Sequence, residues 1–412
     1  MQIADLHLHS HFSRATSKDM TIHELARNAK IKGLHILGTG DFTHPRWLED
    51  LKILLKNNDD GSGIYSYEGI KFVLSGEISL IYSQDGKTRK VHNVLLAPNF
   101  EVVDQINDFL RRKGRLDYDG RPIFGFSCIE LVDQLMRISQ NIEIIPAHAW
   151  TPWFSIFGSM SGFNSVEECF QDRTKYIYAL ETGLSSDPAM NWRISSLDKY
   201  NLVSFSDSHS PYTWRIGREA CVFDMPQLTY KNIIEAIRTR KHFSYTIEVQ
   251  PEYGKYHNDG HRFCNININP KEAMQLNNIC PVCKKPLTIG VLHRVEELAD
   301  REEGYQLEGA VPFKSLIPLM EIIAAVEKTG MVTKKVNELY NILINRFGSE
   351  FNVLLNAESS ELKKIVKDKL AEAIIANRSG KVKIIPGFDG VYGKPQFDIP
   401  AEKKERGLGN FF

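Results

Sequence analysis

Side chains that can bind metal ions stand beside short apolar segments throughout the first half of the chain. The eight are His7, His9, Asp41, Glu77, His92, His148, Asp207 and His209. Residues two apart in a β-strand face the same way, so the run DLHLH places both of its imidazoles on one face. Burying a carboxylate is costly unless it is paired or bound to a metal, which makes simple packing a poor explanation for the whole set. Imidazole and carboxylate ligands suit two or three divalent ions (Zn, Mg or Mn), and such sites typically hydrolyse phosphate esters.

The segments that must position these residues alternate between β-like and helical patterns from residue 2 to about 249. The expected strands are IADLHL, LHILGT, KFVLSGE, HNVLLA, IEIIPA, IYALE, LVSFSD and FSYTIEV. Helices are expected at residues 21–33, 101–114, 128–140, 189–200 and 230–241. Strands separated by helices predict parallel βαβ units, in a barrel or an open sheet, and the number of strands favours a β/α barrel. Either fold gathers ligands at the carboxyl ends of its strands.

A second group of metal-binding side chains follows a Gly-, Pro- and Tyr-rich boundary at residues 250–263. Its members are His261, Cys264, Cys280 and Cys283. Two ligand pairs separated by a loop have the spacing of a zinc ribbon and predict one structural zinc ion. His257 and His293 are also near in sequence and are alternatives for the fourth ligand. The remaining cysteines are expected to be buried hydrophobes.

The chain is long enough for several domains. A barrel is expected at residues 1–249, a zinc-ribbon-like module at 250–294, a helical DNA-binding domain at 295–397 and a tail at 398–412. The helices of the third domain are predicted at residues 313–328, 333–348 and 359–378. The formal net charge is +0, from 51 basic and 51 acidic residues, so contact with nucleic acid would have to come from local basic clusters. The sequence contains neither a signal peptide nor an apolar run long enough to span a membrane, so we expect a cytoplasmic protein. We also expect a monomer.

Several short motifs of the first 249 residues resemble the polymerase and histidinol phosphatase (PHP) family. They are DLHLHS, TGDF, SGEI, VHNVLL, PAHAW and SDSH. The resemblance implies a distorted seven-stranded β/α barrel that holds up to three metals and cleaves phosphoesters.

The same resemblance divides the ligands among three metals. It implies that His7, His9, Glu77 and Asp207 hold one metal, that Glu77, His92 and His148 hold a second, and that Asp41 and His209 contribute to a third. Glu77 would bridge the first two, and it and Asp207 would be central to catalysis. Many family members have another histidine shortly after His9, where this chain reads SHFSRAT, so Asp19 or a water would substitute there. Arg14, in the same loop, is either a clamp for phosphate or an ordinary surface residue.

Two later segments, CPVCKKPLTIGVLHRVEELADR and PGFDGVYGKP, together with the PHP motifs closely resemble the endonuclease Q family of DNA-repair nucleases. This resemblance spans nearly the whole chain. It implies hydrolysis of the phosphodiester on the 5′ side of deaminated bases (hypoxanthine, uracil, xanthine) and at abasic sites. The alternatives are a PHP-family small-molecule phosphatase, such as one acting on a phosphorylated amino alcohol, and a DNA-binding protein with a degenerate barrel.

Aromatic residues near the metal ligands and in the Gly-rich segment could stack on an extruded base, and packing in the core is the alternative. They are Trp150, Trp153, Phe154, Phe157, Phe388 and Tyr392. The tail ends in an aliphatic residue, two spacers and two aromatics, which is the spacing of a sliding-clamp-binding peptide. Leu408, Phe411 and Phe412 would make that contact, and docking onto the same chain is the alternative.

Overall fold

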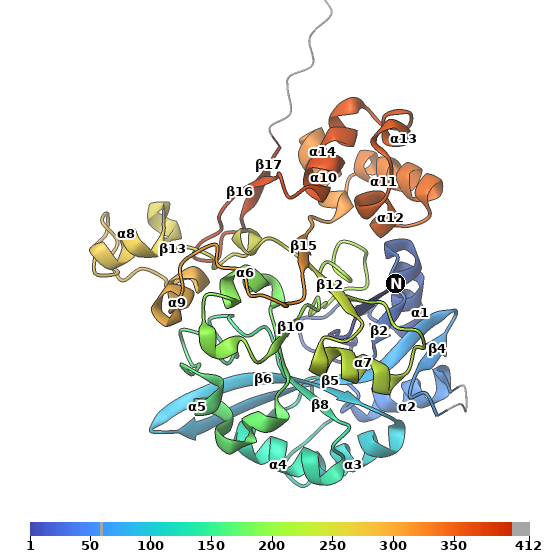
Figure 1. Ribbon diagram of the computed structural model, residues 1–412, viewed down its shortest axis with the longest axis vertical. Helices are drawn as coiled ribbons and strands as arrows, with labels where there is room; N and C mark the ends of the chain where they lie inside the picture. Colours follow the sequence, from blue (N-terminus) through green and yellow to red (C-terminus); the bar gives the residue numbers. More distant parts are fainter. Residues whose placement is uncertain (58–60, 398–412) are drawn as a thin grey trace, which may run out of the picture.

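One curled sheet forms the centre of the fold in a computed structural model, which describes residues 1–57 and 61–397 (Figure 1). The sheet has 11 strands, and its main hydrogen-bonded path runs β15-β12-β11-β1-β2-β5-β4-β3, with β6, β7 and β8 branching from β5 and β6. The bounds are β1 Gln2–Asp5, β2 Ile36–Gly38, β3 Lys56–Asn57, β4 Tyr65–Tyr67, β5 Ile70–Gln84, β6 Lys87–Ala97, β7 Ile123–Phe124, β8 Glu143–Pro146, β11 Ala220–Phe223, β12 Phe243–Glu248 and β15 Phe313–Ser315. The strand at β11 was not among those expected from the sequence.

The strands of this sheet are only partly parallel, so the expectation of parallel βαβ units is wrong for several of them. β1, β2 and β5 run parallel, whereas β5–β6, β6–β8 and β1–β11 are antiparallel pairs. β5 and β6 form a long hairpin whose two-residue turn, Asp85 and Gly86, has φ values of 52° and 72°. An Asp-Gly dipeptide favours this left-handed turn, and here it joins as an antiparallel pair two strands that were expected to belong to parallel units.

Two further strands, β9 (Ala179–Glu181) and β10 (Asn201–Val203), pair in parallel as a separate sheet. Single hydrogen bonds tie its ends to the main sheet, from the amide of Ala149 to the carbonyl of Glu181 (2.9 Å) and from the amide of His9 to the carbonyl of Ser208 (3.1 Å). Among residues 1–57 and 61–397, therefore, the strand ladder is a curled sheet with gaps and does not close as a seven-stranded barrel. These gaps still place the ends of β1, β8, β9 and β10 next to one another.

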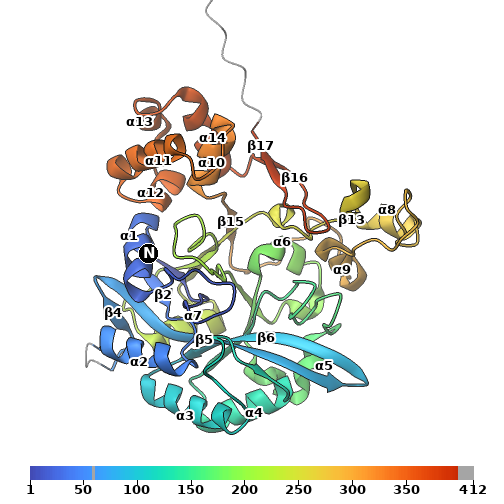
Figure 2. The same ribbon diagram turned by 180° about the vertical axis from the view of Figure 1, so that it is seen from behind.

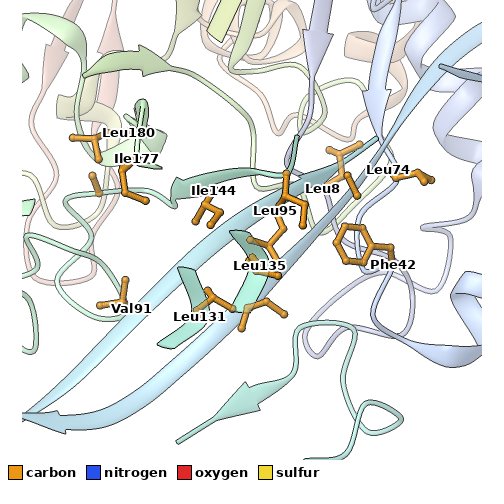
Figure 3. Close-up of a cluster of buried hydrophobic side chains, with 14 of the residues drawn as sticks. Leu8, Phe42, Leu74, Val91, Leu95, Leu131, Leu135, Ile144, Ile177 and Leu180 are labelled. Atoms are coloured by element: carbon orange, nitrogen blue, oxygen red, sulfur yellow. The ribbon is translucent and has the colours of Figure 1, made fainter. Parts of the chain in front are cut away.

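Helices pack on both faces of the sheet: most contribute to the main core, and the helix at residues 230–239 contributes to a second core on the opposite face of the strands. Figure 3 shows Leu131 and Leu135 of α4 facing Leu95 of β6 and Ile144 of β8, all fully buried. The helices of this region are α1 Ile22–Lys32, α2 Pro45–Leu54, α3 Phe100–Arg111, α4 Cys128–Ile138, α5 Val166–Phe170, α6 Pro188–Asn191 and α7 Tyr230–Thr239. Helices α1, α3, α4 and α7 confirm the expected ones. The helix expected at 189–200 is instead the short α6 followed by a 3-10 turn at Ser195–Leu197.

The rest of the chain forms two lobes beside the open end of the sheet (Figures 1 and 2). The first contains β13 Asp259–His261, β14 Ile266–Ile268, α8 Pro270–Gln275 and α9 Val291–Leu298. The second, the helical lobe, contains α10 Leu319–Glu327, α11 Lys334–Phe347, α12 Glu350–Leu355, α13 Ser359–Lys363 and α14 Asp368–Arg378, with its own apolar core. The helix expected at 359–378 breaks at Lys367, whose ψ of 146° is extended. The hairpin β16 Lys383–Ile385 and β17 Lys394–Gln396 connects the two lobes.

The short 3-10 helices complete the secondary structure. Besides Ser195–Leu197 they are Gln171–Tyr176, Gly183–Ser185, Pro251–Tyr253 and Arg262–Cys264. Within the described part of the chain, no helix is both long and apolar enough to cross a membrane. The predicted clamp-binding residues Leu408, Phe411 and Phe412 lie outside the described residues.

Candidate active site

Four of the predicted ligands converge where the ends of β1 and β10 meet the middle of β5. His7, His9, Glu77 and Asp207 each offer one ligand atom, and these atoms all lie within 4.8 Å of one another. Nε2 of His9 lies 3.0 Å from Oδ1 of Asp207 and 3.2 Å from Oε2 of Glu77. Nε2 of His7 is buried without a hydrogen-bond partner, although it faces Oε2 of Glu77 at 3.5 Å. An unpartnered ring nitrogen aimed at two carboxylates fits a site for a divalent metal ion.

A second group shares Glu77 with the first. Oε1 of Glu77 lies 2.8 Å from Nδ1 of His92 and 3.2 Å from Nε2 of His148. The two imidazole nitrogens are 3.3 Å apart, too close for both to carry a proton that points at the other. Glu77 therefore presents one oxygen to each group, as a carboxylate that bridges two metal ions would do.

The sheet register explains how Glu77 reaches both groups. Glu77 pairs with Val94 in the β5–β6 hairpin, so its side chain shares a face with that of His92, which precedes Val94 by two residues in β6. The sequence pattern placed Glu77 at the end of a strand, but β5 continues to Gln84 and Glu77 lies in its interior, 1% exposed. A glutamate at this depth needs a compensating charge.

Charges around Glu77 supply that compensation. Burial alone would raise the pKa of Glu77, but His92, Arg121 and His7 outweigh it and hold that pKa well below the usual range. Burial lowers the pKa of His92 to about 4, against the pull of Glu77. Above about pH 4 His92 is thus neutral, which leaves Arg121 and His7 as the cations that keep Glu77 ionised.

The carboxylates of Glu181 and Asp41 orient the two histidines of the first group from behind. Nδ1 of His7 lies 2.9 Å from Oε1 of Glu181, which also receives the backbone amide of His148 on its other oxygen. Nδ1 of His9 lies 3.0 Å from Oδ1 of Asp41, whose other oxygen accepts from Ser10 and Ser13. Such contacts fix the tautomer of a metal-binding histidine.

Two predicted ligands, Asp41 and His209, therefore lie outside both groups. The ring of His209 is tilted at 50° to that of His9, with the centroids 4.4 Å apart, and its Nδ1 donates to the backbone carbonyl of Asp207 at 3.0 Å. Its side chain is 29% exposed, so it remains accessible beside the first group. Asp41 is fully buried behind His9.

Arg121 and Glu181 are site residues that sequence reasoning missed. Nη1 of Arg121 donates to Oε2 of Glu77 at 2.9 Å, whereas the predicted clamp Arg14 is 70% exposed and pairs with Asp119. Arg121 lies in a loop without any sequence pattern. Glu181 ends an apolar strand, the same feature that identified Glu77, and could have been found by it.

The backbone at three site residues is left-handed. Asp41, His148 and Asp207 have φ values of 48°, 31° and 46°. For residues with a Cβ this costs about 1–3 kcal/mol each, and such strain gathers where a side chain must point in one direction. All three follow strands and turn their side chains back toward the groups.

A cavity of about 710 Å³ opens from the ligand groups toward the two lobes. His148 and Asp207 line its inner end, Arg215 and Arg218 one wall, and Glu321 of α10 the far side. Of the predicted stacking residues, Trp153 and Tyr392 line this cavity and are 40% and 59% exposed.

The other predicted aromatics are packed in the fold. Trp150 and Phe157 are each 1% exposed and Phe388 is 8% exposed, while Phe154 packs against the ring of His92 at 4.7 Å. For these four rings the structure favours the alternative, packing within the fold, over stacking on a base.

The cysteine group comes together on the β13–β14 hairpin and the turn that follows α8. Ligand atoms of His261, Cys264, Cys280 and Cys283 lie within 4.8 Å of one another. Three thiols and an imidazole are a donor set that zinc prefers. The alternative ligands lie elsewhere: Nδ1 of His293 is bonded to Asp259, and His257 is buried outside this group.

A family model and a relative each match part of this chain. Residues 318–381, which span α10 to α14, match the family model for the MJ0043 C-terminal domain. The uncharacterized protein MJ0043 of Methanocaldococcus jannaschii is 34% identical over 291 residues, which cover 69% of this chain and 35% of that protein. The chain thus spans about a third of that relative's length.

Two solved structures match nearly the whole chain. The lesion-specific endonuclease PfuEndoQ of Pyrococcus furiosus is 32% identical with a TM-score of 0.87, over 96% of this chain and 95% of that one. An endonuclease Q in complex with a 27-mer duplex substrate, with an abasic lesion at its active site, is 33% identical with a TM-score of 0.86, over 97% of each chain. The chain belongs to the endonuclease Q family.

Proposed function

We propose that this protein is a metal-dependent DNA-repair endonuclease that hydrolyses the phosphodiester 5′ of deaminated bases (hypoxanthine, uracil or xanthine) and abasic sites. The observation that carries the proposal is the position of two ligand groups, bridged by Glu77, at the inner end of a cavity of about 710 Å³. A relative that matches over 97% of each chain was solved with a duplex whose abasic lesion lies at the active site, which supports DNA as the substrate.

The chemistry follows from the side chains of the two groups. Divalent ions bound there would lower the pKa of a water molecule and offset the negative charge of the phosphoryl group. Glu77 and Asp207 would each supply a carboxylate oxygen as a ligand, and Glu181 fixes the ring of His7. Arg121 is the cation nearest to the bridge and is placed to bind a phosphate oxygen, with Arg14 further out.

The cavity is suited to a nucleotide taken out of the stack. Trp153 and Tyr392 offer ring faces for stacking, and Arg215 and Arg218 offer positive charge for the adjoining phosphates. Because α10 supplies one wall, the site needs the helical lobe, which a phosphatase for a small ester would not. This favours the endonuclease over the small-molecule phosphatase.

Other parts of the proposal rest on the sequence. We include a third metal near Asp41 and His209, a structural zinc at the cysteine group, and a PHP domain at 1–249. The remaining domains are the module at 250–294 and a DNA-binding domain at 295–397. We also include sliding-clamp binding through the tail, a monomeric state and a cytoplasmic location.

The test is a nicking assay on duplexes that carry one deoxyinosine, deoxyuridine, deoxyxanthosine or abasic site. With Mg²⁺, Mn²⁺ or Zn²⁺ the wild type should cut the lesion strand once, 5′ of the lesion, leaving a 3′-hydroxyl, and Asp207→Ala should not. Equal cutting of an undamaged duplex, or no cutting with any of the three ions, would contradict the proposal.

A further inference from the structure

The outer end of the cysteine module exposes more apolar surface than its small core explains. We call Arg262, Phe263, Val282, Lys284 and Lys285 the module tip. Phe263 is 82% exposed and Val282 is 64% exposed, although each precedes a cysteine of the same ligand group. The guanidinium of Arg262 lies 4.9 Å from the centre of the Phe263 ring. An aromatic ring held outward beside a cation is an arrangement that suits contact with a partner.

The charge around the tip is strongly one-sided. Residues 255–290 contain five basic side chains and two acidic ones, in a chain whose net charge is +0. The basic residues are Lys255, Arg262, Lys271, Lys284 and Lys285, and all are exposed. Of the acids, Asp259 is fully buried and bonded to His293, which leaves Glu272. The partner that this charge favours is a polyanion.

The tip is continuous with the cavity at the metal groups. The rings of Trp153 and Tyr256, both on the cavity wall, lie 5.6 Å apart. A Cβ placed on Gly390 would lie 3.9 Å from the hydroxyl of Tyr256 and 3.4 Å from Nη1 of Arg262. The amide of Arg262 donates to Asp389 at 2.7 Å, which fixes the tip against the β16–β17 segment. A partner bound in the cavity can therefore extend without a break to the tip.

We propose that the module tip binds one duplex arm of the DNA substrate beside the cleavage site, with Phe263 inserted at a base step and Lys284 and Lys285 on the phosphates. This inference rests on the proposed function, because it takes the ligand of the cavity to be DNA. Apolar side chains flanked by basic ones are the usual means of wedging open a base step. The tip would hold the duplex bent or unstacked while a nucleotide occupies the cavity.

The first test measures binding to abasic-site duplexes in which one arm stays long and the other is shortened stepwise, for each arm in turn. The full chain is used in an Asp207→Ala background so that the DNA stays intact. Phe263→Ala should weaken binding about tenfold when the contacted arm is long, the size expected for losing a ring that stacks on a base. It should bind like its parent once that arm is too short to reach the tip.

Tyr305→Ala is the matched control. Tyr305 is also an exposed ring beside an arginine, 4.2 Å from Arg301, but it does not line the cavity. Its loss should not change affinity for any duplex. The zinc content and unfolding midpoint of Phe263→Ala should match those of the parent, because the side chain is 82% exposed.

The second test replaces Lys284 and Lys285 together with alanine. If both contact phosphates of the arm, the slope of log affinity against log salt should become shallower by about 2 for the long-armed duplex. An unchanged slope would contradict the contact. Equal losses for Phe263→Ala on long and short arms, or no loss on either, would overturn the proposal. Arm-dependent binding by the Asp207→Ala protein, together with no cutting of the same duplexes by the protein with Asp207 intact, would contradict the proposed function and leave the tip inference standing.

Discussion

Glu77 is the residue on which both ligand groups depend, because each of its oxygens faces a different group. Arg121 and His7 are the cations that keep Glu77 ionised, and Glu181 in turn fixes the ring of His7. A carboxylate behind a histidine sets which ring nitrogen is free, so its removal should affect metal binding without removing a ligand.

We therefore expect Glu181→Gln to weaken metal affinity about 10–100-fold. The amide keeps the shape of the side chain but no longer stabilises the His7 tautomer with Nε2 free for the metal. A calorimetric titration of the apoprotein with metal ions measures this affinity. Glu143→Gln is the control, since Glu143 is also a fully buried glutamate on a strand but pairs with Arg238. Equal metal affinity in Glu181→Gln and wild type would contradict the assigned role.

Glu248 should make the stability of the protein depend on pH. Burial raises its pKa from 4.5 to about 8, and its partners, Thr182 and Thr246, are hydroxyl donors without charge. The folded state thus binds a proton more tightly than the unfolded state. The contribution of Glu248 to the free energy of unfolding is therefore largest below pH 4.5, and it is lost as the pH rises to about 8.

Glu248→Gln should remove most of that fall. The difference in free energy of unfolding between the variant and wild type should therefore be more favourable to the variant at pH 8.5 than at pH 5, by on the order of 2 kcal/mol. Urea unfolding at the two pH values measures it. Glu235→Gln, at an exposed site on α7, should show the wild-type dependence. If the free energies of unfolding of wild type and Glu248→Gln change in parallel between these pH values, the assignment is refuted.

At the scale of elements, a buried ion pair joins helix α1 of the sheet region to α12 of the helical lobe. Nζ of Lys32 lies 2.7 Å from Oε1 of Glu350, and their side chains are 1% and 0% exposed. Glu350 also accepts the hydroxyl of Tyr340, and Lys32 donates to the carbonyl of Thr213. Thr213 lies in the same loop between β10 and β11 as Asp207, so this pair connects the lobe with a ligand-bearing loop.

Lys32→Met should destabilise the protein by about 3–5 kcal/mol, because it leaves the Glu350 carboxylate buried without its cation. Lys32→Met combined with Glu350→Leu should recover part of the loss. The exposed pair Lys30–Glu68 is the control, and Lys30→Met should cost less than about 1 kcal/mol. Denaturant titration measures all three, and equal effects for the two lysines would show that the pair is not a buried link.

At the scale of the whole molecule, the lobes determine what the metal groups can reach. The cavity has its ligand end in the sheet region and its far wall on α10, so substrate choice should be separable from hydrolysis. Ala325 is an α10 residue on that wall and lies away from the ligand groups.

Ala325→Trp should fill part of the cavity and reduce nicking of lesion duplexes at least about tenfold, since overpacking excludes a ligand that needs the space. Hydrolysis of a small chromogenic phosphodiester, which needs only the ligand end, should stay near the wild-type rate. Ala325→Ser is the conservative control for both assays. A parallel loss of both activities would mean that the cavity is not a separate binding site.

The sequence by itself determined the chemistry and much of the local structure. Ligand types, their spacing in DLHLH and SDSH, and the helices α1, α3, α4 and α7 follow from side-chain chemistry and from periods of two and 3.6 residues. The group of three cysteines and His261 could also be predicted from the sequence, because its ligands lie close together along the chain.

Only the tertiary structure decided the pairing of β5 with β6 as one long hairpin, the interior position of Glu77, and the approach of Arg121 and Glu181 to the ligands. The tertiary structure also placed Asp41 behind His9. It put Trp153 and Tyr392 on the cavity wall and buried Trp150 and Phe388. The physical reason is that a residue's own neighbours set its face on a strand or helix. Which distant face it meets depends on how the whole sheet curls and packs, and that free energy is shared over the entire chain.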